Sequence, residues 1–170
     1  MKLCKYLLVI IVLFCLLCFT SCKGFPAQSD PEGNSMIYAV LSSPYSQSYF
    51  FTLNKDGTYI VEKGDGSLED LMDDNIKQTT TSQTNLDNAN YNEIIEIADN
   101  LGEFDGNENI VFDYWTASIC YNQSTMYFTY GCSKNKNYDL LVTKLIELSP
   151  LDVVDPYGNI IEPAQLEHYM

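Results

Sequence analysis

The 170-residue chain contains no arginine, and its nine lysines stand against 23 aspartate and glutamate residues, which gives a net charge of −14. A chain this acidic is repelled by the phosphate backbone of nucleic acids. Nucleic acid is therefore excluded as a partner. The acidity itself is typical of a soluble surface that is held away from anionic lipid headgroups.

Histidine is almost as scarce, since His168 in the C-terminal tail is the only one. A Ser/His or Cys/His catalytic arrangement then has no plausible base, and zinc lacks its usual ligands. The sequence also contains neither the nucleophile-elbow motif of hydrolases nor a glycine-rich phosphate-binding loop. We therefore predict no catalytic residue, no cofactor and no metal site, and we expect that the protein is not an enzyme.

One acidic segment, residues 64–75, invites a calcium interpretation. Its carboxylates are Asp65, Glu69, Asp70, Asp73 and Asp74. Counted from Asp65, however, the position that must be glycine in an EF-hand loop is occupied by Asp70, and the ligand order is wrong. A solvated loop is the preferred interpretation.

Further carboxylates, among them Glu103, Asp105 and Asp113, leave a second chemistry open. A pair of carboxylates can hydrolyse a glycosidic bond when the two groups are correctly separated. In so acidic a chain such a pair arises by chance, and its separation cannot be read from the sequence. A carboxylate-dependent hydrolase therefore stays an alternative.

The N-terminal end has the features of an export signal. Lys2 and Lys5 precede an uncharged apolar run over residues 6–19. A basic start followed by a short apolar run is typical of a signal peptide, whereas a spanning helix needs about 20 apolar residues. We therefore expect export, with a retained anchor as the weaker alternative.

This run closes with Phe19, Thr20, Ser21 and Cys22, a stretch that resembles the bacterial lipobox. Thr20, Ser21 and Cys22 match that motif, while Phe19 stands where leucine is usual. The resemblance covers residues 1–22 and implies that Cys22 is acylated, with palmitate-like chains, and becomes the new N-terminus after cleavage. Two acyl chains anchor a protein stably to a membrane that it does not span. The alternative is an ordinary secretory signal that leaves Cys22 as a free thiol.

Cleavage there removes Lys2 and Lys5 and leaves seven lysines against 23 acidic residues, a net charge of −16. Residues 23–35 are rich in proline and glycine, which predicts a flexible tether. Residues 36–170 have the length of a single domain.

Alternating or continuous apolar runs predict the first strands, at residues 36–41, 49–54 and 58–63, and a polar edge strand at 76–82. The loop Lys55-Asp56-Gly57 predicts a hairpin with Gly57 in the left-handed conformation. That register places four side chains on one face, those of Phe51, Leu53, Tyr59 and Val61.

Helical spacing of apolar residues predicts helices over residues 88–101 and 137–148. Asp87 is a good N-cap for the first helix, and Gly102 supplies a left-handed residue after it. Glu93 and Glu96 of this helix are expected to point outward.

A second hairpin is expected from residues 113–121 and 125–132, turning at Asn122 and Gln123. Its register sets three pairs on an apolar face, Ile119 with Met126, Ala117 with Phe128, and Trp115 with Tyr130. We therefore expect a buried Trp115 and not an exposed sugar-binding platform. Cys120 falls on the polar face and Cys132 on the apolar face, so that an intramolecular disulfide between them is not expected.

A short final strand at residues 151–154, and a return of residues 160–161 to the sheet, complete the expected elements. The predicted fold class is α+β, an antiparallel sheet of about six or seven strands with two amphipathic helices packed on one face.

The body of the chain resembles small envelope lipoproteins in style. The function we expect is that of a noncatalytic binding or interaction module in the bacterial cell envelope, tethered through Cys22 and facing the periplasm or the exterior. Its partner would be the membrane together with an envelope protein or a glycan. The alternatives are a structural or stress-related lipoprotein without a discrete ligand, and the carboxylate-dependent hydrolase.

Overall fold

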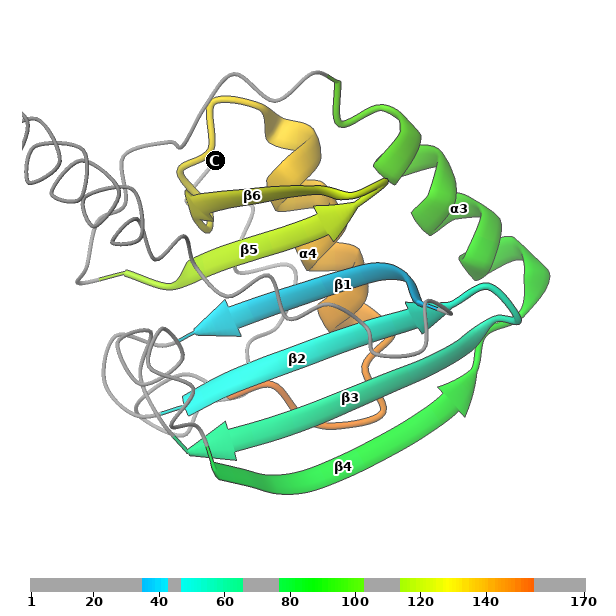
Figure 1. Ribbon diagram of the computed structural model, residues 1–170, viewed down its shortest axis with the longest axis vertical. Coiled ribbons are helices and arrows are strands. Elements are labelled where there is room, and N and C mark those ends of the chain that lie inside the picture. Colours follow the sequence, from blue (N-terminus) through cyan, green and yellow to red (C-terminus); the bar gives the residue numbers. More distant parts are fainter. Residues whose placement is uncertain (1–34, 43–46, 66–76, 103–113, 155–170) are drawn as a thin grey trace, which may run out of the picture.

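The computed structural model describes residues 35–42, 47–65, 77–102 and 114–154. They form an α+β fold with one six-stranded antiparallel sheet, in the order β4-β3-β2-β1-β5-β6, and two helices (Figure 1). The strands are β1 Ser35–Ser42, β2 Gln47–Asn54, β3 Thr58–Asp65, β4 Lys77–Asn85, β5 Thr116–Tyr121 and β6 Ser124–Thr129. The helices are α3 Asn88–Asp99 and α4 Lys136–Glu147.

All six strands and both helices correspond to predicted elements, with ends that differ by up to three residues. The predicted final strand at residues 151–154 is wrong, because only Val154 forms an isolated bridge. Here the backbone is engaged locally, since the Leu151 amide donates to Ser149 Oγ and Ser149 Oγ donates to the Leu151 carbonyl. The predicted return of residues 160–161 lies outside the described residues.

Rows of paired side chains run across the sheet on one face. One row joins Val61, Phe51, Ala39, Ile119 and Met126 on five successive strands. These five side chains are all buried, as period-2 alternation requires of a face that is covered. The neighbouring row, Tyr59, Leu53, Ile37, Tyr121 and Ser124, is buried only over its first three members.

The β2–β3 hairpin has the predicted turn. Gly57 has a φ of 84°, and its amide donates to the Asn54 carbonyl at 3.1 Å. Phe51 pairs with Val61 and Leu53 with Tyr59, and all four are fully buried, which confirms the predicted face.

Helix α3 begins at Asn88 as predicted and ends at Asp99, two residues before the predicted end. The carboxylate of Asp87 accepts a hydrogen bond from the Asn90 amide at 2.8 Å, which satisfies one of the free donors of the first turn. Gly102, with a φ of 76°, follows its end. Glu93 and Glu96 are exposed, as expected.

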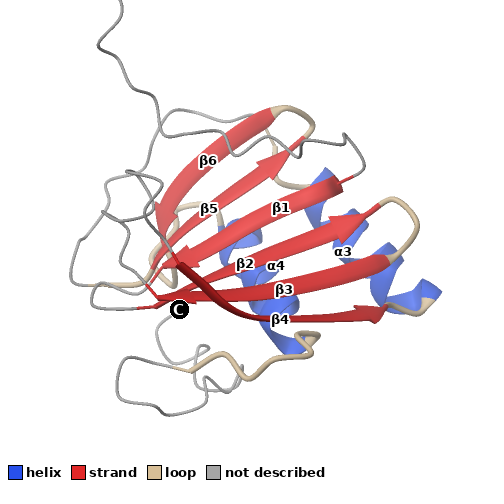
Figure 2. Cartoon of the chain, turned by 60° about the horizontal axis from the view of Figure 1, so that its bottom comes forward, coloured by secondary structure: helices blue, strands red, loops and turns tan. Residues whose placement is uncertain are grey.

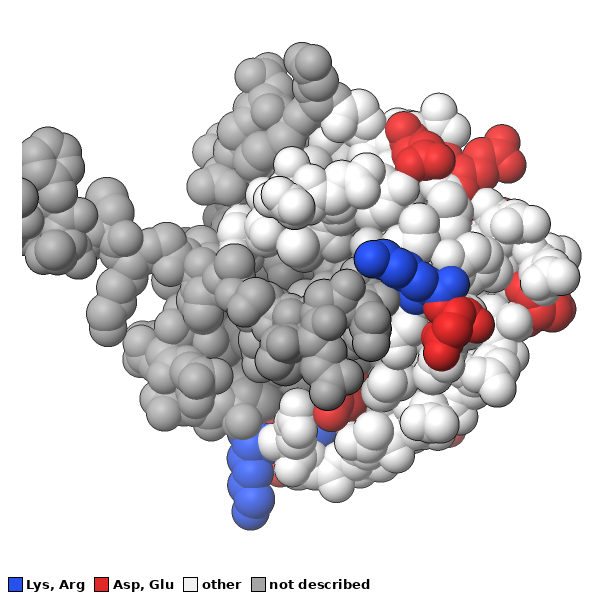
Figure 3. All heavy atoms as spheres, turned by 45° about the vertical axis from the view of Figure 1, so that its right-hand side comes forward, with Lys and Arg blue, Asp and Glu red and all other residues white. Residues whose placement is uncertain are grey.

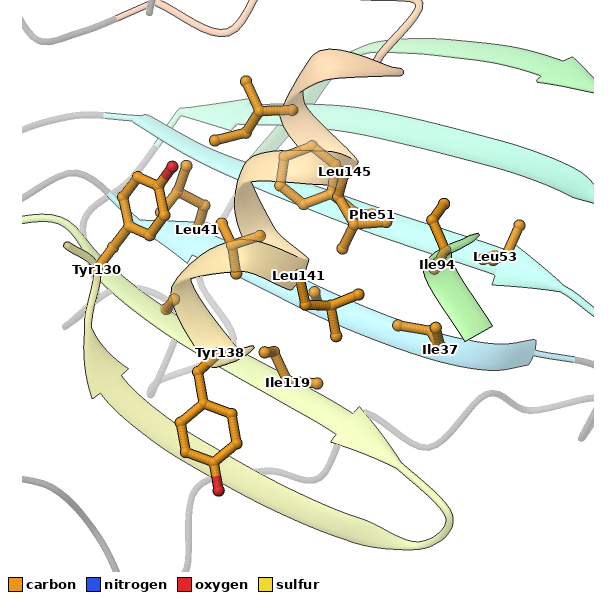
Figure 4. Close-up of a cluster of buried hydrophobic side chains, with 14 of the residues drawn as sticks. Ile37, Leu41, Phe51, Leu53, Ile94, Ile119, Tyr130, Tyr138, Leu141 and Leu145 are labelled. Atoms are coloured by element: carbon orange, nitrogen blue, oxygen red, sulfur yellow. The ribbon is translucent and has the colours of Figure 1, made fainter. Parts of the chain in front are cut away.

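Helix α4 joins the same hydrophobic core through Tyr138, Leu141 and Leu145 (Figure 4). The hydroxyl of Tyr59 on β3 donates to the carbonyl of Leu145 at 2.6 Å. That carbonyl belongs to the last turn of α4, where carbonyls lack partners within the helix. In Figure 2 both helices appear behind the sheet. In the part of the chain that the structure describes, no helix is long and apolar enough to cross a membrane.

The β5–β6 hairpin turns at Asn122 and Gln123, which have φ values of 49° and 65°. Ile119 pairs with Met126 and Ala117 with Phe128, which confirms the predicted register. Beyond these pairs the ladder is shorter than expected, since it runs only from Thr116 to Thr129.

Two expectations at the open end of this hairpin are therefore wrong. Trp115 is only half-buried, because it precedes β5. The centre of its ring lies 6.3 Å from that of Tyr49. Its backbone carbonyl accepts a hydrogen bond from the Tyr130 amide. Cys132 does not continue the apolar row, because its amide donates to the Thr129 carbonyl in a turn that leaves the residue exposed. Cys120 and Cys132 are both free thiols.

Candidate ligand-binding pocket

A cavity of about 740 Å³ lies between the end of α3 and the turn of the β5–β6 hairpin. Figure 1 shows this end of α3 beside that turn. The lining residues come from two stretches of the chain, Ala98, Asp99, Leu101 and Gly102 at the helix end and Ile119, Tyr121, Asn122, Ser124 and Met126 on the hairpin. The volume is within the range of known small-molecule sites.

The floor of the pocket is apolar. Ile119 and Met126 form a cross-strand pair at the end of the buried row described above. Ala98 and Leu101 of the α3 end are also buried members of the hydrophobic core. The pocket is thus a place where the core reaches the surface, and hydrocarbon entering it would leave water.

A carboxylate and a phenol form the polar part of the lining. The hydroxyl of Tyr121 donates to Asp99 Oδ1 at 2.5 Å and so joins β5 to α3. Burial, followed by this contact with Asp99, raises the pKa of Tyr121 above its usual value. The phenol is therefore a stable donor, and Asp99 is an acceptor that remains solvent-exposed.

Asn122 and Ser124 belong to the hairpin turn that borders the pocket, and both are exposed. Asparagine tolerates the left-handed conformation better than most residues, which suits Asn122 to this turn. The amide and the hydroxyl add neutral donors and acceptors beside Asp99. None of the described residues that line the pocket is a lysine.

A second hollow of about 420 Å³ lies between α3 and α4. Its lining includes Glu93, Glu96, Leu140, Lys144 and Glu147. The ammonium of Lys144 is 2.8 Å from Glu93 and 3.8 Å from Glu147, and the hydrogen bond to Glu93 is the main reason that the pKa of Lys144 is raised. Because these charges pair with one another, the hollow is best explained as a contact between the helices.

On the described part of the surface in Figure 3 most side chains are uncharged, and acidic side chains and lysines are few. Among the residues that the structure describes, no group of three or more His, Cys, Asp or Glu side chains is placed to hold a metal ion. Of the carboxylates in the acidic segment only Asp65 is described, and it is exposed at the end of β3.

The remaining residues singled out from the sequence lie outside the described residues, namely Cys22, Glu69, Asp70, Asp73, Asp74, Glu103, Asp105, Asp113 and His168. Conversely, the sequence analysis missed Asp99 and Tyr121. One signal was available for Asp99: it falls in the last turn of the helix predicted over residues 88–101, and that turn carries no basic residue. A negative charge is unfavourable at that end of a helix.

Comparison with known proteins found no matching family model, no matching curated protein and no matching solved structure. The functional argument therefore depends on the residues of this chain.

Proposed function

We propose that this protein is a lipid-anchored lipoprotein of the bacterial cell envelope whose domain is a noncatalytic binding module. The observation that supports binding is the pocket beside Asp99 and Tyr121, which combines an apolar floor with a few polar groups. Ligand sites in proteins usually have this composition. Among the described lining residues there is one carboxylate, whereas hydrolysis by paired carboxylates requires two.

The anchor is proposed from the sequence of residues 1–22, in which a basic start and an apolar run lead to Cys22. Cleavage and acylation at Cys22 would tether the domain to the membrane through residues 23–35. A domain with a net charge of −16 would be repelled by anionic headgroups and held away from the bilayer.

Acylation is tested by metabolic labelling of producing cells with a palmitate analogue. The wild type and Cys120→Ser should be labelled equally, because Cys120 lies within β5, while Cys22→Ser should lose the label. Equal labelling of Cys22→Ser and the wild type would contradict the proposed anchor.

We further propose that α3 and α4 pack together on one face of the sheet. Support comes from the shared core, which contains Ile94, Leu141 and Leu145 of the helices together with the strand row from Val61 to Met126. The hydrogen bond from Tyr59 to Leu145 and the ion pair between Glu93 and Lys144 support the same arrangement. The pocket would then lie at the edge of the covered face.

Binding is tested in living cells by placing a photo-crosslinking amino acid at Asn122, beside the pocket. The matched control is the same amino acid at Gln83, an exposed position of the edge strand β4. A defined adduct that forms at position 122 and not at position 83 would support a binding module. Identical adducts at both positions, or none at either, would favour a structural lipoprotein without a discrete ligand.

A further inference from the structure

We infer that the pocket binds a small amphipathic ammonium ion, that is, a protonated primary amine carried on an apolar chain or ring. This inference rests on the proposed function, because it names the class of ligand for the same pocket.

The charge of the pocket selects the sign of the ligand. Among the described residues that line the pocket, Asp99 is the only charged one. An anion entering the pocket would meet this carboxylate and no lysine among the described lining residues, in a chain that has no arginine and a net charge of −14. A cation is attracted both by Asp99 and by the field of the whole protein.

Asp99 has the capacity to hold an ammonium group. An ionised carboxylate offers about four acceptor sites, and the hydroxyl of Tyr121 uses one of them on Oδ1. An ammonium group carries three N–H donors and can reach the remaining sites. The contact with Tyr121 also holds the carboxylate beside β5, so that less freedom is lost when a ligand binds.

The apolar floor distinguishes an organic ammonium ion from a metal ion. The one carboxylate among the described lining residues is too few for calcium, which takes six to eight oxygen ligands, and a hydrated ion gains nothing from contact with Ile119 and Met126. Hydrocarbon placed on these two side chains and on Leu101 gains free energy by leaving water. Charge and floor together therefore favour a cation with an apolar body.

A carboxylate at position 99 is unfavourable for the stability of the fold, and this strengthens the inference. As the last residue of α3 it places a negative charge at the negative end of the helix dipole. Places where a residue opposes the local structural preference are expected at functional sites. Neutralising Asp99 should therefore leave the fold intact and remove the attraction for a cation.

The test uses the whole lipidated chain in neutral-detergent micelles, observed by methyl NMR. The probe is cyclohexylammonium, with cyclohexanol as the neutral probe of equal shape and cyclohexanecarboxylate as the anion. Cyclohexylammonium should shift the methyl signals of Ile119 and Met126 saturably and leave that of Ile60 on β3 unchanged. Its affinity should exceed that of cyclohexanol about tenfold, the factor expected for one hydrogen bond to a charged group, and the carboxylate should not bind.

Two variants on the same helix complete the test. Asp99→Asn should lower the affinity for cyclohexylammonium about tenfold, leave that for cyclohexanol unchanged, and keep or raise the melting temperature. Glu96→Gln removes the same charge from a position outside this pocket and should change the affinity by less than about twofold.

Equal affinities for the ammonium ion and the alcohol, or equal behaviour of the two variants, would overturn the inference. Shifts of Met126 with a neutral disaccharide of N-acetylated amino sugars, but not with cyclohexylammonium, would also overturn it, while leaving the proposed binding module intact with a glycan as ligand. If no probe shifted these methyl groups, the inference would again be wrong. The adducts at Asn122 would then decide separately on the proposed function.

Discussion

The two hairpins on either side of β1 follow the same alternation of side chains but meet different surroundings. In β2–β3, Leu53 and Tyr59 are fully buried at the turn end of the hairpin. At the equivalent end of β5–β6, in the same cross-strand row, Tyr121 is half-buried and Ser124 is exposed. The first hairpin is buried in the hydrophobic core up to its turn, whereas the turn of the second hairpin borders the pocket. From this difference we expect that stability is concentrated in the first hairpin, while the proposed binding would involve the second.

The largest expected effect tests this division directly. Phe51→Ala, at the centre of β2, should lower the free energy of unfolding by about 3–5 kcal/mol, because the buried ring leaves a cavity. Met126→Ala on β6 should cost about 2 kcal/mol, the lower end for such a truncation, because the space created joins a pocket that already exists. Urea unfolding followed by the fluorescence of Trp115 measures both. Equal losses would remove the distinction between the hairpins.

The sequence predicted both hairpins equally well where a strand pairs with the strand that follows it in the chain. The turn at Gly57 and the register at Ile119 and Met126 depend on local pattern alone. The early end of β6 does not, since the Gly131 amide donates to a carboxylate oxygen of Asp139 at 2.8 Å, on α4. The Cys132 amide, which would continue the ladder to β5, donates to the Thr129 carbonyl instead.

The pocket could not be predicted for the same reason. Asp99 and Tyr121 are 22 positions apart and belong to different elements, so that their hydrogen bond depends on how α3 lies against the sheet. The alternation of side chains places Tyr121 on the correct face of β5. It does not show that Tyr121 and Ser124, at this end of their cross-strand row, are less buried than the rest of the row. Trp115 was misjudged because the alternation continues in the sequence beyond the first residue of the strand.

The next effect concerns Trp115. Its half-burial and its ring contact with Tyr49 predict that Trp115→Ala costs about 1–2 kcal/mol, less than the 3–5 kcal/mol of a fully buried tryptophan. Unfolding must be followed by circular dichroism, because this is the only tryptophan. In the wild type, acrylamide should quench the native emission partially. A loss as large as that of Phe51→Ala would show that the end of the second hairpin is as well packed as the first.

Tyr59→Phe tests the link between the first hairpin and α4. Removal of the hydroxyl leaves the Leu145 carbonyl without its donor and should cost about 1–2 kcal/mol at neutral pH. Tyr114→Phe, at an exposed position, is the control and should cost nothing measurable.

The same pair of variants gives a prediction for alkaline pH. Burial raises the pKa of Tyr59 well above the usual value of 10.0. The folded state therefore keeps a proton that the unfolded state loses, so the contribution of Tyr59 is complete below pH 10 and is lost as pH rises above it. Above pH 10 this group should lower the free energy of unfolding of the wild type by about 1.4 kcal/mol per pH unit. The Tyr59→Phe variant lacks the phenol, so its free energy of unfolding should fall less steeply with pH by that amount. Parallel slopes for the two proteins would contradict the buried phenol.

The smallest expected effects compare the two turns. Gly57 has a φ of 84°, and a Cβ added there would be in ordinary contact, at 3.7 Å, with the Leu86 carbonyl, so that Gly57→Ala should cost about 1 kcal/mol through backbone strain alone. Gln123 adopts a φ of 65° with a side chain, and Gln123→Gly would create the Asn-Gly sequence that such two-residue turns prefer. We expect a gain of about 0.5–1 kcal/mol from that substitution. Opposite signs in urea unfolding would show that the first turn already has its best residue, whereas the turn beside the pocket keeps one that strains it. If Gln123→Gly instead lowered the free energy of unfolding, the glutamine side chain would stabilise the turn. The contrast between the two hairpins would then not extend to their turns.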